Sequence, residues 1–193
     1  MKQRPYGTLS LILLTIIVTA ASALFDGSLY GVEAHPADWW SFSPTAPMRL
    51  WRLTWLLSAF LHLGPSHLVT NLFILFPVAM MIERKKGPAH LLGMSALIHL
   101  LVLGGLLFGI SLWSLQGKAF LGSSHFILGL YMYWGILQRR WSLLLLPAGV
   151  LLWGVWQDQS SLILLAHILG TLAGVGLGVG SHFREKLRLQ RPN

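Results

Sequence analysis

Ser124 and His167 are the residues of this chain that could form a nucleophile and its base. Ser124 begins an apolar stretch directly after Gly122-Ser123, and His167 follows Ala166 near the start of the last apolar stretch. A serine hydroxyl becomes nucleophilic when an imidazole takes its proton, and the same imidazole can later protonate the leaving group. The two side chains therefore predict acyl-transfer chemistry, provided that the helices carrying them lie side by side.

The oxyanion formed in such a reaction needs hydrogen-bond donors. His67 and Asn71 stand near the start of another apolar stretch and offer side-chain donors, and the backbone N–H of Ser124 offers a third. Gly122 would let the chain turn tightly into the helix that presents Ser124. These residues are the candidate oxyanion site.

Each of these polar residues alone is weak evidence. An isolated serine in an apolar helix usually bonds to a carbonyl of its own helix, and an isolated histidine usually pairs with a neighbouring polar group. Polar groups inside apolar helices are costly, however, and are functional candidates for that reason. The prediction of catalysis depends on several of them meeting at one depth.

Composition places these residues in a lipid bilayer. Hydrophobic residues make up 54% of the 193-residue chain and charged residues only 10%, which is too apolar for a soluble domain. The chain has no cysteine, so disulfides, thiolate metal sites and a cysteine nucleophile are excluded. The formal net charge of +8 is divided among small clusters and forms no continuous face for nucleic acid.

Apolar runs bounded by charged or turn residues predict six transmembrane helices in a single all-α membrane domain, residues 1–193. The predicted spans are 7–24, 66–83, 88–109, 123–137, 141–156 and 161–181. Prolines and tryptophans between the first two spans predict an interfacial first loop at headgroup level. In the last span Gly170, Gly174 and Gly178 recur every four residues, which predicts close contact with a neighbouring helix.

The basic residues predict the orientation of these spans, because Lys and Arg accumulate in cytoplasmic segments. An N-terminus in the cytoplasm leaves only Arg49, Arg52 and Lys118 outside. The basic residues then inside are Lys2, Arg4, Arg84, Lys85, Lys86, Arg139, Arg140, Arg184, Lys186, Arg188 and Arg191. The second, fourth and sixth spans then enter from the outside, so that their polar first turns share the outer leaflet.

In order and spacing, these residues resemble the rhomboid family of intramembrane serine proteases. The segments that carry the resemblance are Trp51-Arg52, His62 and His67 followed by Asn71, Ile82-Glu83-Arg84, Gly122-Ser123-Ser124, and Ala166-His167-Ile168 with Gly170 and Gly174. Individually these pieces are short. Their occurrence in register on three outside-entering helices is what makes the resemblance specific.

The resemblance implies a catalytic Ser124–His167 dyad without a third acid, and oxyanion donors on His67 and Asn71. It also implies that Trp51-Arg52 belongs to the structured first loop, and Glu83-Arg84 to a structural polar network at the inner end of the second helix. Substrates would be transmembrane proteins that enter sideways near the second and fifth helices. We expect a bacterial inner-membrane protein with both termini cytoplasmic, an active site open to the periplasmic side, and no cofactor or metal.

Two residues depart from the family pattern. His125 stands where the family usually has glycine after the nucleophile, and Leu128 stands where an aromatic side chain often stacks on the catalytic histidine. Ser123 carries a neighbouring hydroxyl that could be mistaken for the nucleophile, although the spacing from Gly122 favours Ser124 in that role.

These departures leave alternatives open. One is a catalytically inactive relative that binds transmembrane clients, and another is membership of the rhombosortase-like branch. A metal or ion site formed by His62, His67, His125 and His167 is a third, although their spacing offers no compact metal motif. The remaining histidines, His35, His90, His99 and His182, are expected to be interfacial or packing residues.

Overall fold

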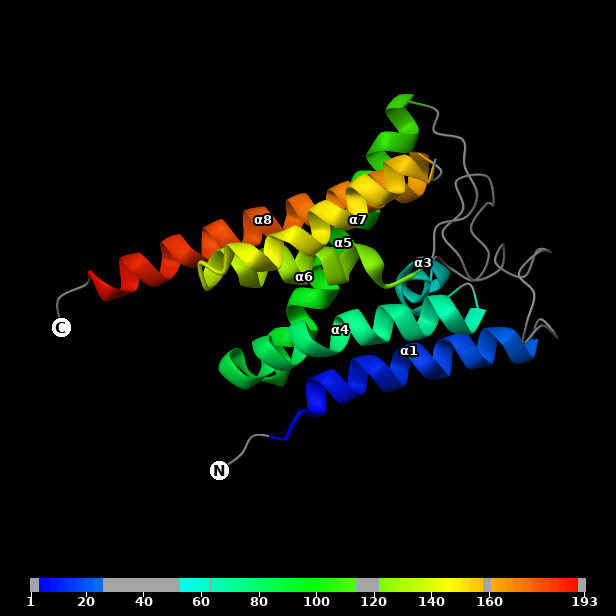
Figure 1. Ribbon diagram of the computed structural model, residues 1–193, viewed down its shortest axis with the longest axis horizontal. Coiled ribbons are helices and arrows are strands. Elements are labelled where there is room, and N and C mark those ends of the chain that lie inside the picture. The colour runs from blue at the N-terminus through cyan, green and yellow to red at the C-terminus, as the bar shows by residue number, and fades with distance from the viewer. Residues whose placement is uncertain (1–3, 26–52, 63, 114–121, 158–160, 191–193) are drawn as a thin grey trace.

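The computed structural model describes residues 4–25, 53–62, 64–113, 122–157 and 161–190, and within these ranges every regular element is a helix (Figure 1). The α-helices are α1 (Tyr6–Phe25), α3 (Leu53–Leu57), α4 (Gly64–Lys86), α5 (Pro88–Trp113), α6 (Ser124–Leu137), α7 (Leu145–Trp156) and α8 (Ser161–Leu189). Two 3-10 helices, η2 (Ser58–Phe60) and η3 (Trp141–Leu144), precede α4 and α7. Each predicted span overlaps one helix, or η3 and α7 together, and helices α4 and α8 extend beyond the bounds predicted for them, 66–83 and 161–181.

Four of the described helices are long and apolar enough to cross a bilayer: α1, α4, α5 and α8. The other two predicted spans are shorter. Helix α6 has 14 residues and α7 has 12, and 14 residues of α-helix extend only about 21 Å against a hydrocarbon core of about 30 Å. The all-helical membrane fold is therefore established, whereas the number of six spans stays a prediction.

Helix α6 lies at the centre of the bundle. It packs against α4, α5, α7 and α8, and only Ser124, Met132 and Ile136 among its residues are not fully buried. Helices α1 and α4 run side by side, and α5 crosses the other helices obliquely (Figure 1). The start of α1 and the end of α8 lie at the same end of the bundle (Figure 1).

Glycines bring α8 into direct backbone contact with α6. A Cβ added at Gly170 would lie 2.1 Å from the carbonyl oxygen of His125, and one added at Gly174 would lie 2.1 Å from that of Gly129. Gly178 repeats the contact one turn later at Tyr133, at 3.0 Å. Because the side chains are absent, the two backbones approach as closely as in other small-residue helix contacts. The close packing predicted from the glycine spacing is present, and its partner is α6.

The buried carboxylate of Glu83 attaches α1 to α4. Glu83 is 2% exposed and accepts hydrogen bonds from the backbone N–H groups of Gly7 and Thr8, both at 2.7 Å, and from the Thr8 hydroxyl at 2.6 Å. The first N–H groups of a helix have no carbonyl partner within it, and the helix dipole favours negative charge there. Glu83 therefore caps α1 from a different helix.

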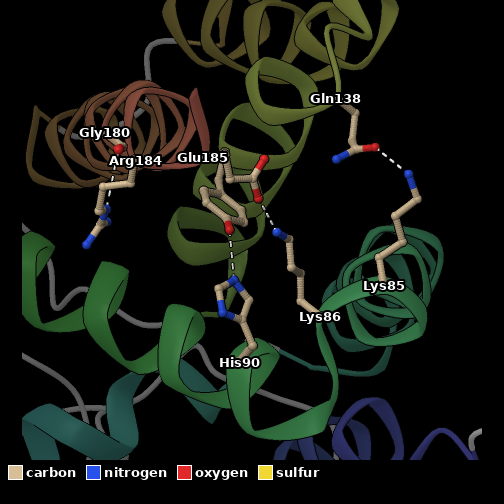
Figure 2. A network of polar contacts seen from close by, with 8 residues as sticks. Lys85, Lys86, His90, Gln138, Gly180, Arg184 and Glu185 are labelled. Atoms are coloured by element: carbon tan, nitrogen blue, oxygen red, sulfur yellow. Dashed lines mark hydrogen bonds and ion pairs between the residues drawn. The ribbon is translucent and has the colours of Figure 1, made fainter. Parts of the chain in front are cut away.

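Further polar contacts join helices at this end of the bundle, as Figure 2 shows. Lys86, at the end of α4, pairs with Glu185 of α8. The His90 ring of α5 lies 2.8 Å, Nε2 to hydroxyl, from Tyr133 of α6. These contacts hold the helix ends together at the side of the protein that is farthest from Ser124.

Candidate active site

A glycine turn leads into the helix that carries Ser124. Gly122 has a φ of +116°, a conformation that strains residues with a side chain. Its N–H donates to the carbonyl of Ser58 at 2.9 Å. An added Cβ would lie 3.1 Å from Cε1 of His67. The backbone conformation and the imidazole packed against the turn both favour glycine at this position.

Ser124 and His167 form a hydrogen-bonded pair between α6 and α8. The Oγ atom of Ser124 lies 2.8 Å from Nε2 of His167. The Gly170 contact with the backbone of His125 lies within one turn of both residues, so the small-residue packing is what brings the two side chains within reach. Ser124 is partly exposed, whereas His167 is 5% exposed. The hydroxyl is therefore accessible while its partner is held inside.

The second nitrogen of His167 has no acidic partner in the described part of the chain. Nδ1 is buried and accepts or donates no hydrogen bond among the described residues. For Nε2 to take the Ser124 proton, the hydrogen of the neutral ring must lie on Nδ1. The arrangement is that of a two-residue Ser–His pair.

The candidate oxyanion donors are one backbone N–H, that of Ser124, and the side chains of His67 and Asn71. Its own N–H belongs to the first turn of α6, where backbone N–H groups have no carbonyl one turn earlier. His67 reaches the site through its contact with Gly122. Asn71 is 5% exposed, and its Nδ2 donates to the carbonyl of His67 at 2.9 Å. The described contacts bring His67 to the turn before Ser124, whereas the Asn71 amide bonds to its own helix.

Comparison with known families identifies the fold that carries this pair. The family described as Rhomboid domain matches residues 47–182, which is more than half of the chain. The chain belongs to the rhomboid family. Its members are generally intramembrane serine proteases, and the apolar helices accordingly make this rhomboid an integral membrane protein. None of the curated proteins compared with it gives a match.

The hydroxyl of Ser123, which neighbours the candidate nucleophile of this rhomboid, forms a separate hydrogen bond. It is fully buried, and its Oγ lies 3.0 Å from Nε2 of His62. Nδ1 of His62 faces the carbonyl of Phe60 at 3.3 Å. Because a carbonyl only accepts, the hydrogen of His62 lies on Nδ1, and the Ser123 hydroxyl donates to Nε2. The described residues thus include two adjacent Ser–His pairs, Ser123–His62 and Ser124–His167, and of the two serines Ser124 is partly exposed whereas Ser123 is buried.

Burial keeps His62 neutral at physiological pH. The pKa of His62 is lowered to about 4, mainly by desolvation and also by the nearby ring of His67, while the Phe60 carbonyl opposes the shift. The ring therefore stays an acceptor for Ser123. The hydroxyl at the N-cap position of α6 makes no capping bond, because His62 engages it.

His125 and Leu128, which depart from the family pattern, are both buried. The His125 ring does not reach the dyad as a second base but hydrogen-bonds to His99 of α5, Nε2 to Nδ1, at 2.8 Å. The sequence predicted only an interfacial or packing role for His99. The signal that could have singled it out is its position in the middle of the apolar stretch 88–109, where an unpaired imidazole is costly.

The remaining predicted motif residues are Trp51, Arg52, Glu83 and Arg84. Trp51 and Arg52 lie outside the described residues. Glu83 caps α1, and Arg84 is exposed, with no contact to Glu83 among the described interactions. Within the described ranges no three His, Asp or Glu side chains are grouped as a metal site requires.

Proposed function

We propose that this rhomboid is an intramembrane serine protease that cleaves transmembrane segments of other membrane proteins near the outer membrane boundary. The observation that carries the proposal is the 2.8 Å contact between Ser124 Oγ and His167 Nε2, on a partly exposed serine. An imidazole at this distance can take the hydroxyl proton as the oxygen attacks a carbonyl.

The reaction would proceed in two stages. Ser124 Oγ attacks the scissile carbonyl while His167 Nε2 takes the proton, and the resulting oxyanion is held by the N–H of Ser124 and by His67 and Asn71. His167 then protonates the leaving amine, which departs. Water, activated by the same imidazole, hydrolyses the acyl-enzyme and releases Ser124.

We place this chemistry at the periplasmic side of a bacterial inner membrane, with six spans and both termini in the cytoplasm. The clusters of Lys and Arg at the ends of α4, α6 and α8 support this orientation. A 14-residue α6 that begins below the membrane surface would place Ser124 within the outer leaflet.

Substrate helices would enter sideways between α4 and α7. Helix α7 is the most weakly packed of the candidate gate elements, because only Pro147 and Gly154 of its residues are buried. Its exposed face carries Leu152, Trp153 and Trp156, side chains that suit lipid or an apolar substrate helix.

A serine-reactive fluorophosphonate probe tests the proposal. The purified protein should be labelled at Ser124, and the label should disappear in Ser124→Ala. Ser95→Ala is the matched control, because the Ser95 hydroxyl bonds to the carbonyl of Leu91 on its own helix. Equal labelling of the two variants would disprove the assignment of Ser124.

A second candidate function is the binding of transmembrane clients without cleavage. It is favoured by His125 and Leu128, which alter the positions where the family shapes the nucleophile and holds its base. Failure of both probe labelling and cleavage of a helix-destabilised model substrate, in protein that remains folded, would support this alternative.

A further inference from the structure

A pair of buried histidines lies directly behind the candidate nucleophile. His125 follows Ser124 in the first turn of α6 and is fully buried, and His99 of α5 is 6% exposed. His125 Nε2 and His99 Nδ1 are 2.8 Å apart. On its other side, Nε2 of His99 lies 3.2 Å from the carbonyl oxygen of Trp55. The two rings thus connect the helix that carries Ser124 with the short helix α3.

The acceptors determine where the hydrogens lie. A carbonyl oxygen can only accept, so the hydrogen of a neutral His99 ring lies on Nε2 and points to Trp55. Nδ1 of His99 is then an acceptor, and the hydrogen between the rings must belong to Nε2 of His125. The hydrogen bonds therefore run in one direction, from His125 to His99 to the Trp55 carbonyl, which we call the imidazole relay.

A second connection joins the other side of Ser124 to the same segment. The N–H of Gly122 donates to the carbonyl of Ser58 at 2.9 Å, and the hydroxyl of Ser58 donates to the carbonyl of Trp55 at 2.6 Å. Residues before and after Ser124 are consequently held by one short stretch, 55–58. A helix start held on both sides cannot rotate about its axis without breaking one of these bonds.

Rotation of this turn would carry Ser124 Oγ away from Nε2 of His167, which lies 2.8 Å from it. Successive residues of an α-helix point about 100° apart, so His125 faces the interior while Ser124 faces His167. We infer that His99 and His125 are positioning residues for the proposed protease reaction: their relay sets the rotation of the first turn of α6, so that Ser124 Oγ and its N–H face the substrate carbonyl. Neither ring touches the substrate.

This inference rests on the proposed function. Substitutions can distinguish a hydrogen-bonding role of the two histidine rings from simple filling of the core. Leucine in place of either histidine fills the same space without a hydrogen bond. His125→Gln keeps an N–H donor at similar reach, whereas His125→Leu removes it. The double variant His99→Leu/His125→Leu removes both ends of the bond.

The experiment measures the second-order rate constant of fluorophosphonate labelling, together with kcat and KM for a model transmembrane substrate. A turn misplaced by about 1 Å lowers the rate by about 100-fold, so we expect such a loss of kcat in His125→Leu and His99→Leu with KM unchanged. The double variant should be no slower than the slower single variant, because the residues act as a unit. His125→Gln should recover most of the rate. A double variant whose loss is the product of the single losses, or a His125→Gln as slow as His125→Leu, would overturn the inference.

A measurement on the unaltered protein covers the case in which the leucine variants fail to fold. With 15N-labelled histidine, nuclear magnetic resonance should show a coupling across the hydrogen bond between His125 Nε2 and His99 Nδ1, with the hydrogen on His125. If the fluorophosphonate probe reacts with Ser124 but this coupling is absent, the relay is contradicted and the proposed protease activity is not. If the coupling is present but the fluorophosphonate probe does not react with Ser124, the proposed protease activity is contradicted and the relay geometry is not.

Discussion

Gly170→Ala tests whether the backbone contact of α6 and α8 sets the geometry of the dyad. The added Cβ would lie 2.1 Å from the carbonyl oxygen of His125, whereas ordinary contact begins near 3.4 Å. The obstacle is backbone and not the end of a flexible side chain, so the two helices must separate by about 1.3 Å, the difference between these distances.

Separation on this scale breaks the Ser124–His167 hydrogen bond. If α8 moves away from α6 along the contact, the distance between Oγ and Nε2 lengthens from 2.8 Å to about 4 Å, beyond hydrogen-bond range. A displacement of about 1 Å lowers a catalytic rate by about 100-fold. Overpacking of this kind also destabilises a protein by about 1–3 kcal/mol.

The assay compares Gly170→Ala with Gly176→Ala, the same substitution in the same helix. A Cβ at Gly176 would meet nothing within 4 Å, so this control should keep the labelling rate and the melting temperature of the unaltered protein. Gly170→Ala should lose about two orders of magnitude in labelling rate and melt at a lower temperature. Equal rates for the two variants would refute the claim that this contact positions the dyad.

Three further predictions concern residues around the site and at the opposite end of the bundle. Glu83→Ala should destabilise the protein by about 3 kcal/mol, because hydrogen bonds to a charged group are strong and the donors of α1 would be left unpaired. Its control in the same melting assay is Glu185→Ala, which breaks an exposed ion pair and should cost about 0–1 kcal/mol. Folding lowers the pKa of His62 from 6.5 to about 4, so the unfolded chain binds more protons than the folded protein between these pH values. The contribution of a neutral His62 to stability is therefore complete above pH 6.5 and is lost as the pH falls toward 4. His62→Gln should flatten this part of the plot of stability against pH. Gly122→Ala should lower both stability and labelling rate, because φ is +116° and an added Cβ would lie only 3.1 Å from the ring of His67.

Different outcomes would contradict each of these expectations. Equal melting temperatures for the two glutamate variants would show that the α1 cap contributes little. An unchanged pH dependence in His62→Gln would assign the acid sensitivity to another group. Full activity of Gly122→Ala would show that the turn can adopt a different conformation.

The helices were predictable because apolar runs report burial in lipid directly. The predicted stretch 123–137 corresponds to α6, Ser124–Leu137, and 88–109 begins where α5 begins, at Pro88. The glycine spacing also indicated a close helix contact. The six spans that these runs predict stay a prediction, because α6 and α7 are both shorter than the hydrocarbon core is thick.

The pairing of polar side chains was less predictable, because it depends on how each helix is rotated and where it crosses its neighbours. Ser124 and His167 could be matched through the family resemblance. The bond between His99 and His125, by contrast, joins two helices at positions that no spacing rule relates. The partner of Ser123 likewise lies 61 residues earlier in the chain, at His62. The donors to Glu83 are largely backbone N–H groups, which every residue except proline carries and which therefore leave no signal in the sequence.

The Glu83 cap has a consequence for how the protein assembles in the membrane. Its donors at the start of α1 are synthesised about 75 residues before the carboxylate itself, so they must wait for the end of α4 to arrive. The bond can form only if α1 and α4 run antiparallel with the first turn of one level with the last turns of the other. A single carboxylate thereby fixes the relative direction and the alignment across the membrane of two helices that are far apart in the sequence. An α4 inserted at the wrong depth would leave that charge without its donors, which selects against misaligned insertion.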